Sequence, residues 1–192
     1  MRRVVVVGNG GWGTALALVL HAAGQEVALW AHDAEYAALM RESRSNPRFL
    51  PGYEIPASVA IESDLERVLP GAELLVSAVP TAFLRDVWTA HTPLLPSALP
   101  IVSVSKGLEN ETLLRPTEIL REVTGEERVV SVLSGPNIAR EIAAGLPAAS
   151  VVASPDPALA RRISTTFTCP QFRVYSNPDH VGVELGGVLK NV

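Results

Sequence analysis

Apolar stretches rich in β-branched residues alternate along the chain with helical stretches of about a dozen residues. Residues 4–7 are four valines in a row, which predicts a strand buried on both faces. This alternation is typical of a parallel α/β fold. Further strands are predicted at residues 27–30, 74–79, 101–104, 129–133, 149–153 and 172–175. Helices are predicted at residues 12–23, 83–95, 114–123, 138–144 and 158–167.

Polar residues mark where the shorter elements begin. Asp33 is expected to cap a helix that runs to about Ser43. Ser63 and Glu66 have the spacing of a capping box, which predicts a short helix directly after Ser63. The stretch 46–56 holds three prolines and one glycine, and we expect it to be an irregular loop.

The last residues continue a helical pattern to the end of the sequence. Apolar side chains recur at helical spacing from Val181 to Val192, with no cap or breaker after them. We therefore expect residues 1–178 to form one domain and residues 179–192 to begin a second, helical domain that is missing from this chain. Apolar residues exposed on this last segment could also create a homodimer that the complete protein would not form.

A glycine-rich turn lies between the first predicted strand and the first predicted helix. Gly8, Gly10 and Gly13 give the pattern G-x-G-x-x-G in the sequence GNGGWG. In this context the first glycine permits a tight turn, the second lets the backbone approach a pyrophosphate, and the third allows close packing of the helix. The pattern predicts a dinucleotide site on a Rossmann-like, largely parallel, doubly wound sheet of about eight strands. Gly11 and Trp12 lie in the same turn.

The end of the second predicted strand bears on the choice of dinucleotide. Asp33 follows Gly13 at the distance expected of an acidic residue that binds the ribose 2′-hydroxyl, although it is equally placed to cap a helix. Its neighbour His32 could donate a hydrogen bond to a 2′-phosphate. We favour NADPH, with NADH as the alternative.

Candidate chemistry follows several other strand ends, which meet at one edge of such a sheet. Phe83 follows the third predicted strand with Pro80 and Thr81, and could form an apolar wall beside a nicotinamide. Lys106 follows the next strand, and Asn137 lies after the strand beyond it. Of sixteen basic residues only two are lysines, at positions 106 and 190. A desolvated Lys190 could transfer a proton to a carbonyl that receives hydride.

Composition and charge narrow the classes of partner. A net charge of −4 argues against nucleic acid. Apolar residues make up 47% of the chain, enough to fill a core, but no run is long enough to span a membrane. Cys169 is the single cysteine, which excludes an internal disulfide and favours a cytoplasmic protein. Neither a metal-ligand spacing among the histidines nor a partner for a nucleophilic Cys169 is evident, so we expect no metal site.

Four segments together resemble a known family. They are GNGGWGTALA, SKGLE from Ser105, SGPNIAREIAAGLP from Ser134, and YSNPDHVGVELGGVLKNV from Tyr175. In this order they look like the amino-terminal domain of bacterial NAD(P)-dependent glycerol-3-phosphate dehydrogenase. The resemblance implies reversible reduction of dihydroxyacetone phosphate to sn-glycerol 3-phosphate for phospholipid synthesis. It also implies a second, all-helical domain that this chain lacks, so we expect residues 1–192 to bind nucleotide without turnover.

The resemblance also implies roles for individual residues. Lys190 matches the catalytic acid/base, and Lys106 matches a lysine that contacts substrate and cofactor. The remaining positions that match cofactor or substrate contacts are Gly11, Trp12, His32, Phe83, Gly135, Asn137, Ala139 and Asn191. Gly11 stands where many relatives carry Ser, and Asn137 where many carry Ser or Thr.

Two other functions remain open on the sequence alone. A ketopantoate or hydroxyacid reductase shares this architecture but would prefer a carboxylate substrate to a phosphate ester. A noncatalytic dinucleotide sensor would keep its nucleotide affinity when Lys190 is replaced, whereas a reductase would lose turnover.

Overall fold

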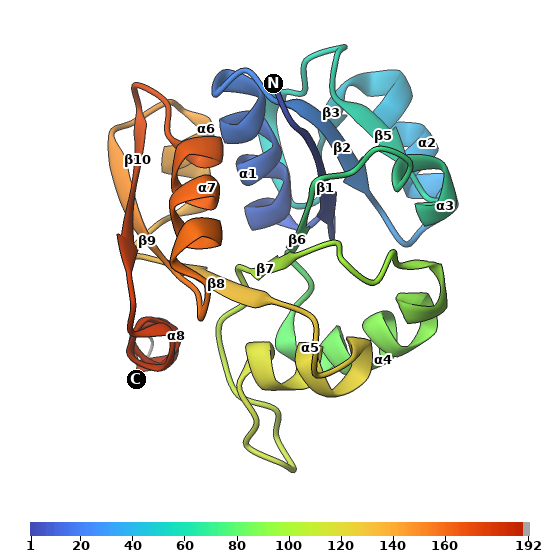
Figure 1. Cartoon of the computed structure of the whole chain (residues 1–192). Coiled ribbons are helices and arrows are strands. Elements are labelled where there is room, and N and C mark those ends of the chain that lie inside the picture. Colours follow the sequence, from blue (N-terminus) through green and yellow to red (C-terminus); the bar gives the residue numbers. More distant parts are fainter. Residues whose placement is uncertain (190–192) are drawn as a thin grey trace.

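The structure, a computed structural model, describes residues 1–189. Helices and strands alternate for most of this length, as the sequence predicts (Figure 1). The strands are β1 (Arg3–Val7), β2 (Glu26–Trp30), β3 (Ser45–Asn46), β4 (Leu50–Glu54), β5 (Ala60–Glu62), β6 (Leu74–Ser77), β7 (Ile101–Ser103), β8 (Val130–Ser134), β9 (Ala148–Ala153) and β10 (Phe172–Asn177). The helices are α1 (Gly11–Ala22), α2 (Ala34–Ser43), α3 (Leu65–Val68), α4 (Thr81–His91), α5 (Pro116–Thr124), α6 (Ala139–Ala143), α7 (Pro157–Phe167) and α8 (His180–Leu189), with a 3-10 turn η1 (Thr92–Leu94).

The strands form one large sheet, with a separate hairpin made of β3 and β4. The order in the large sheet is β10-β9-β8-β7-β6-β1-β2-β5, which gives eight strands. Neighbouring strands pair in parallel except β8 and β9, which are antiparallel. The predicted largely parallel, Rossmann-like sheet is therefore confirmed. Among the described residues, no helix is both long and apolar enough to cross a membrane.

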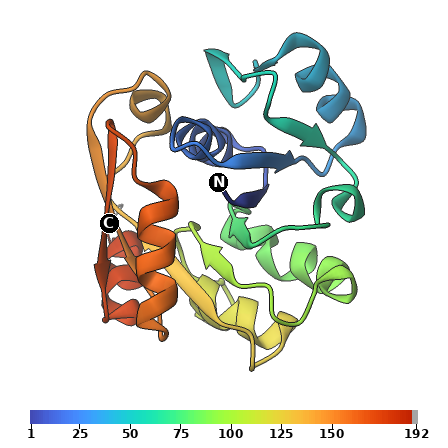
Figure 2. The same cartoon turned by 45° about the horizontal axis from the view of Figure 1, so that its top comes forward.

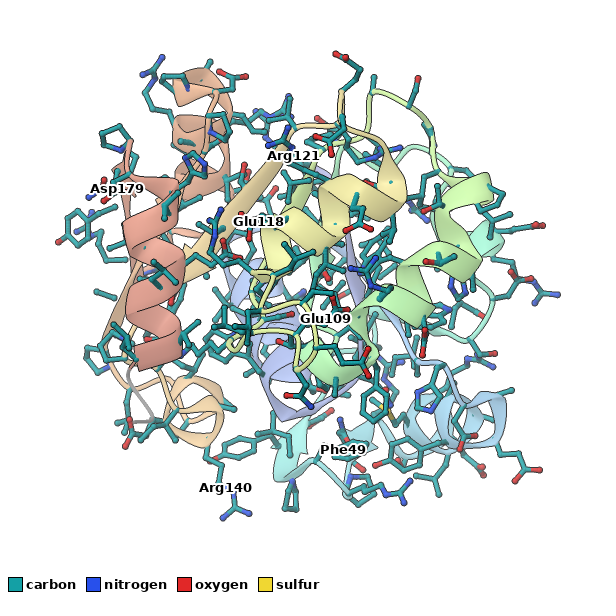
Figure 3. The ribbon with its side chains drawn as sticks, turned by 90° about the horizontal axis from the view of Figure 1, so that it is seen from below. Phe49, Glu109, Glu118, Arg121, Arg140 and Asp179 are labelled. Atoms are coloured by element: carbon teal, nitrogen blue, oxygen red, sulfur yellow. The ribbon has the colours of Figure 1, made fainter. Side chains whose placement is uncertain are left out.

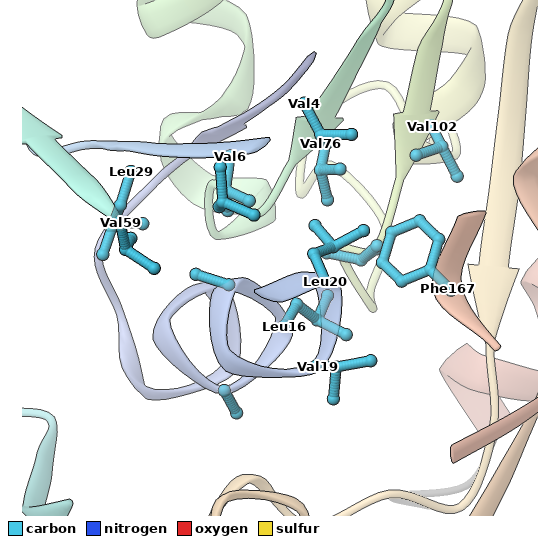
Figure 4. Packing of buried hydrophobic residues seen from close by; sticks show 14 of the residues in the cluster. Val4, Val6, Leu16, Val19, Leu20, Leu29, Val59, Val76, Val102 and Phe167 are labelled. Carbon is cyan, nitrogen blue, oxygen red and sulfur yellow. The ribbon is translucent and has the colours of Figure 1, made fainter. Parts of the chain in front are cut away.

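Alternate residues of the central strand β1 enter two different cores. Val4 and Val6 pack with α1, α2 and α7 on one face of the sheet (Figure 4). Val5 and Val7 pack with α3, α4 and α5 on the other face. The four valines of this strand are buried because helices cover both faces, which agrees with the reading of an unbroken apolar strand.

The strand directions place several loops at one edge of the sheet. β1, β2, β6, β7 and β8 run the same way, so the segments that follow them meet at their carboxyl ends, in the lower part of Figure 1. Viewed from a second direction, α1 crosses one face of the sheet, with α7 beside it (Figure 2). In a doubly wound sheet this edge is where ligands bind.

Several local predictions are wrong, each for a tertiary reason. The stretch 46–56 was expected to be an irregular loop, but β3 and β4 pair as an antiparallel hairpin, and Asn46 is fully buried. Pro51 lies in this small two-stranded sheet, where an edge strand tolerates proline. The short strand β5 was missed. Its three residues extend the large sheet beyond β2.

The start of α3 also differs from the expectation. Asp64, not Ser63, caps the helix, and its Oδ1 accepts a hydrogen bond from the Glu66 N–H at 3.0 Å. The carbonyl of Ser63 accepts a hydrogen bond from Trp30 Nε1 at 2.9 Å. The capping box predicted from Ser63 and Glu66 is therefore wrong by one residue. The cap predicted at Asp33 is confirmed, because its Oδ1 accepts from the Tyr36 N–H at 3.0 Å.

Candidate functional site

The glycine-rich turn after β1 passes through a narrow space between two neighbouring strands. The N–H of Gly8 donates to the Trp30 carbonyl at the end of β2, at 3.1 Å. A Cβ on Gly8 would lie 2.8 Å from the Ala78 carbonyl oxygen beyond β6, and its φ is +118°. Only glycine satisfies both the conformation and the space at this position.

Gly13 and Gly10 occupy very different surroundings. A Cβ on Gly13 would lie 2.0 Å from the Gly8 carbonyl oxygen, because α1 packs directly onto the turn. A Cβ on Gly10 would meet nothing within 4 Å, and its φ of −62° suits any residue. The fold therefore requires glycine at Gly13 and not at Gly10. Open space at Gly10 is what the close approach of a pyrophosphate to the backbone needs.

The first turn of α1 presents donors that no side chain satisfies. Its N-cap, Gly10, makes no side-chain capping bond, and the first turn holds no acidic residue. The free N–H groups and the helix dipole together favour an anion at this end. Trp12 Nε1 is buried without a hydrogen-bond partner among the residues that the structure describes. The turn thus has the donors and the space that a dinucleotide phosphate group requires.

A cavity of about 350 Å³ opens where this turn meets the carboxyl ends of β6 and β7. It brings together seven of the residues expected at the cofactor or substrate site: Gly10, Gly11, Trp12, Gly13, Lys106, Asn137 and Ala139. The remaining lining residues are 78–80, 104 and 105. The glycine-rich turn and Lys106, which are far apart in the sequence, therefore share one cleft.

The β3–β4 hairpin covers the other side of the turn. Asn46 Nδ2 donates to the Asn9 carbonyl at 2.7 Å and to Thr14 Oγ1 at 2.8 Å. Its Oδ1 accepts from the Tyr36 hydroxyl at 2.7 Å and from the Phe49 N–H at 3.1 Å. Asn46 thereby ties the hairpin to the glycine-rich turn. The sequence analysis placed Asn46 in a loop and did not predict this role, because the bonds join residues far apart in the sequence.

The same hairpin explains the glycine at position 11. A Cβ there would lie 2.6 Å from the Phe49 carbonyl oxygen, so a serine would not fit without a shift of the hairpin. The hairpin also reaches α6, where the Tyr53 hydroxyl donates to the Arg140 carbonyl at 2.9 Å. Figure 3 shows Phe49 and Arg140 near each other at this end of the molecule.

Lys106 connects three strand ends. Its Nζ donates to the Gly135 carbonyl after β8 at 2.8 Å, and its own carbonyl accepts from Thr81 Oγ1 after β6 at 3.2 Å. The preceding residue, Ser105, donates from Oγ to the Val79 carbonyl at 2.6 Å. These bonds fix the segment after β7, where Lys106 lines the cleft.

Ion pairs hold the segment that follows Lys106. Arg85 of α4 donates to both carboxylate oxygens of Glu109, at 2.8 and 2.9 Å, and also pairs with Glu122 of α5. The bonds from Arg85 lower the pKa of the Glu109 carboxyl from 4.5 to about 2. Glu109 lies between α4 and α5 in Figure 3. Neither Arg85 nor the role of Glu109 was predicted, because their pairing is a long-range contact.

Other candidate residues lie outside this cleft. His32 and Asp33 are exposed at the carboxyl end of β2 and do not line the cavity. Phe83 is 61% exposed on the first turn of α4 and does not line the cavity. Pro80, which was expected to form an apolar wall together with Phe83, does line it. Gly135 accepts the Lys106 bond and lines an adjacent cavity of about 390 Å³. Lys190 and Asn191 lie outside the described residues.

Asn137 lies just before α6 but does not cap it. Its side chain donates to Ser150 Oγ on β9, and Ile138 is the residue at the N-cap. The N–H of Asn137 donates to the Gly135 carbonyl at 2.9 Å. Asn137 therefore sits between the cavity that holds Lys106 and the neighbouring one.

The chain is similar to proteins of one family over most of its length. The family model described as "NAD-dependent glycerol-3-phosphate dehydrogenase N-terminus" matches residues 3–160. A protein of Nocardia farcinica named glycerol-3-phosphate dehydrogenase (NAD(P)+) is 46% identical over 198 residues, which cover 100% of this chain and 59% of that protein. A protein of the same name from Koribacter versatilis is 45% identical, over 100% of this chain and 58% of that protein. The chain thus spans less than two thirds of the length of these relatives.

Solved structures agree with the sequence relatives. The glycerol-3-phosphate dehydrogenase of Coxiella burnetii superposes with a TM-score of 0.89 at 35% identity, over 96% of this chain and 56% of that one. A pyrroline-5-carboxylate reductase of the same organism has a TM-score of 0.70 at 11% identity, which shows a shared fold alone.

Proposed function

Since the chain belongs to the family of NAD-dependent glycerol-3-phosphate dehydrogenases, we propose that the whole protein reduces dihydroxyacetone phosphate to sn-glycerol 3-phosphate, reversibly, with NADPH or NADH. The observation that carries this proposal is the single cleft shared by the glycine-rich turn and Lys106. One part of that cleft suits a dinucleotide phosphate, and the other offers an ammonium for an anionic or carbonyl substrate. The product would supply phospholipid synthesis.

The residues of the cleft fit the implied cofactor. The open space at Gly10 and the free N–H groups at the start of α1 would hold the pyrophosphate. Gly8 and Gly13 would shape the turn, and Gly11, Trp12 and Ala139 would line the site beside it. When bound, NADPH or NADH supplies the hydride. Phe83 is proposed to lie near the nicotinamide, where its exposed ring is available for contact.

Residues at the end of β2 would set the preference between the two nucleotides. His32 is exposed there and would donate a hydrogen bond to a 2′-phosphate. Asp33 uses Oδ1 to cap α2, and its carboxylate would favour a free ribose 2′-hydroxyl. We favour NADPH and propose that both nucleotides bind.

The substrate would lie beside Lys106, Gly135, Asn137, Lys190 and Asn191. Lys106 is proposed to contact both substrate and cofactor, because it lines the cleft and its ammonium donates to the Gly135 carbonyl. Lys190 is proposed as the catalytic acid that protonates the substrate oxygen as hydride reaches the carbonyl carbon. The support for Lys190 and Asn191 is the likeness of the segment VELGGVLKNV to the family.

Two statements about organisation are also proposals. We propose that the dinucleotide-binding domain comprises residues 1–178 and that residues 179–192 begin the next domain. A homodimer is proposed on the exposed apolar side chains of α8, among them Leu185 and Leu189. Sedimentation equilibrium of residues 1–192 tests it: a monomer at micromolar concentration would contradict a dimer.

The direct test of the reaction uses the complete reading frame. NADPH and NADH absorbance is followed after addition of dihydroxyacetone phosphate, beside a Lys190→Ala variant whose nucleotide affinity is measured separately. We expect fast oxidation that the variant loses while it still binds nucleotide. Oxidation with ketopantoate and not with dihydroxyacetone phosphate would favour the keto-acid reductase. Nucleotide binding without oxidation of either kind would favour the sensor.

A further inference from the structure

A buried carboxylate joins α8 to the start of α5. Glu184 lies on α8 and is 2% exposed. Its Oε1 accepts from the Thr117 N–H at 2.9 Å, and its Oε2 accepts from Thr117 Oγ1 at 2.6 Å and from Arg115 Nη1 at 2.9 Å. Thr117 is in the first turn of α5, so Glu184 caps that helix from another helix. Both helices also pack against β8, which passes between them in Figure 3.

Burial of the Glu184 carboxylate costs free energy unless several donors bond to it. Burial raises the pKa of the Glu184 carboxyl, while the bonds from Thr117 and the charge of Arg115 act to lower it. Removing one partner of a buried pair leaves an uncompensated charge, which is strongly destabilising. The three donors therefore fix the place of Glu184, and with it the distance between α8 and α5.

The same buried face of α8 also packs against the candidate site. A Cβ on Gly187, three residues after Glu184, would lie 2.4 Å from Ser134 Oγ at the end of β8. The same Cβ would lie 3.6 Å from Lys106 Cγ. The α8 backbone is thus the wall beside which the Lys106 side chain runs. Asp179 fixes the start of this helix, because its Oδ1 accepts from the Gly182 N–H at 2.8 Å.

We propose that Glu184 is a positioning residue, which holds α8 against α5 and thereby keeps the Gly187 backbone beside Lys106, so that the Lys106 side chain stays at the cleft with its ammonium on the Gly135 carbonyl. The importance of Lys106 for substrate rests on the proposed function. The placement of Lys106 by Glu184 is a statement about this fold alone. Two kinds of measurement therefore separate the two claims.

The first measurement follows the accessibility of Lys106. Lys106 and Lys190 are the two lysines of the chain, so peptide mapping separates their acetylation by acetic anhydride without ambiguity. Glu184→Gln keeps the size of the side chain and removes its charge. We expect this change to raise the acetylation rate of Lys106 by about threefold or more, because α8 loosens locally.

A matched control lies in the same network. Glu118 pairs with the same Arg115, at 2.7 Å, but belongs to α5 itself and does not touch α8 through that bond. Glu118→Gln removes an equal charge and should leave the acetylation rate of Lys106 within about a factor of 1.5. Thr117→Val removes a donor to Glu184 from the α5 side and should raise the rate in the same direction as Glu184→Gln. It provides a second test if Glu184→Gln fails to fold.

The second measurement is kinetic and uses the complete protein. We expect Glu184→Gln to lower kcat/KM for dihydroxyacetone phosphate by about tenfold while the Kd for NADPH changes less than about twofold. If the wild type does not reduce dihydroxyacetone phosphate but the acetylation pattern holds, the proposed function fails and the positioning role stands. Equal acetylation of Lys106 in the wild type, Glu184→Gln and Thr117→Val would overturn the proposal. An equal increase in Glu118→Gln would also overturn it, because it would show a general loosening of the network.

Discussion

At the scale of single residues, the three glycines of one motif meet different constraints. Gly8 needs a positive φ, and Gly13 needs room, since a Cβ there would lie 2.0 Å from the Gly8 carbonyl oxygen. Gly10 has neither constraint, because its backbone is ordinary and the space around it is open. The motif identifies all three glycines in the sequence. Only the structure separates Gly8 and Gly13, which shape the turn, from Gly10, which leaves space for a ligand.

This separation gives a prediction for stability. Gly13→Ala should lower the free energy of unfolding by about 2 kcal/mol or more, because the new methyl overlaps the turn. Gly10→Ala should lower it by less than about 1 kcal/mol, the cost of a poorer N-cap. Urea unfolding followed by circular dichroism measures both. Equal losses in the two variants would show that the turn is packed differently from this description.

The ion pair between Arg85 and Glu109 predicts how stability depends on pH. The Glu109 pKa is lowered from 4.5 to about 2 in the folded protein. A lowered carboxyl pKa stabilises the folded state fully above the unfolded value of 4.5, and this contribution disappears as the pH falls from 4.5 to about 2. Glu109→Gln should therefore be less stable than the wild type at neutral pH, and the difference should shrink through this window.

Urea midpoints of both proteins, measured between pH 7 and pH 2, test this expectation. Glu122→Gln serves as a control, because Glu122 pairs with the same arginine but is more exposed. A wild-type advantage that stays constant down to the lowest pH would exclude the ion pair as its source.

At the scale of elements, the long apolar strands were predictable and the short ones were not. The runs of β-branched residues placed β1, β2, β7, β8 and β9 within about two residues of their observed ends, because burial on both faces shapes the sequence itself. β3, β4 and β5 were missed, since they depend on contacts made far along the chain. Asn46 bonds to Asn9 across 37 residues, and Glu184 bonds to Thr117 across 67. No periodicity of the local sequence reports such pairs.

The β3–β4 hairpin gives a prediction at this scale. Asn46→Ala removes the bonds to the Asn9 carbonyl, Thr14 and the Tyr36 hydroxyl at a fully buried position. We expect a loss of about 2–4 kcal/mol in the free energy of unfolding, because several buried groups are left without a partner. The affinity for NADPH should fall as well, since the hairpin no longer holds the turn.

A control for this variant lies next to Asn46. Ser45→Ala removes an exposed hydroxyl that bonds to Ser43 Oγ, and should change the free energy of unfolding by less than about 0.5 kcal/mol. Chemical denaturation and NADPH titration of Asn46→Ala and Ser45→Ala show whether the hairpin supports the glycine-rich turn. A mild effect of Asn46→Ala on both quantities would mean that the hairpin does not support the site.

At the scale of the whole molecule, the strand order explains why residues far apart in the sequence share a cleft. β1, β6 and β7 are neighbours in the sheet and run the same way, so the glycine-rich turn, the segment after β6 and the segment with Lys106 meet at one edge (Figure 1). Both nucleotides and the proposed substrate are anions, yet the chain carries a net charge of −4. Attraction must therefore come from local groups, namely the start of α1 and Lys106, and not from the field of the molecule.

Titration of NADPH into the wild type and Gly10→Ala, followed by nicotinamide fluorescence, tests this account most directly. The fold leaves Gly10 free, so any loss of affinity in Gly10→Ala reports a ligand at the turn. We predict saturable binding by the wild type and a Kd at least about tenfold weaker for the variant, equivalent to about 1.4 kcal/mol, with the fold intact. Equal affinities, or no binding by the wild type, would contradict the account.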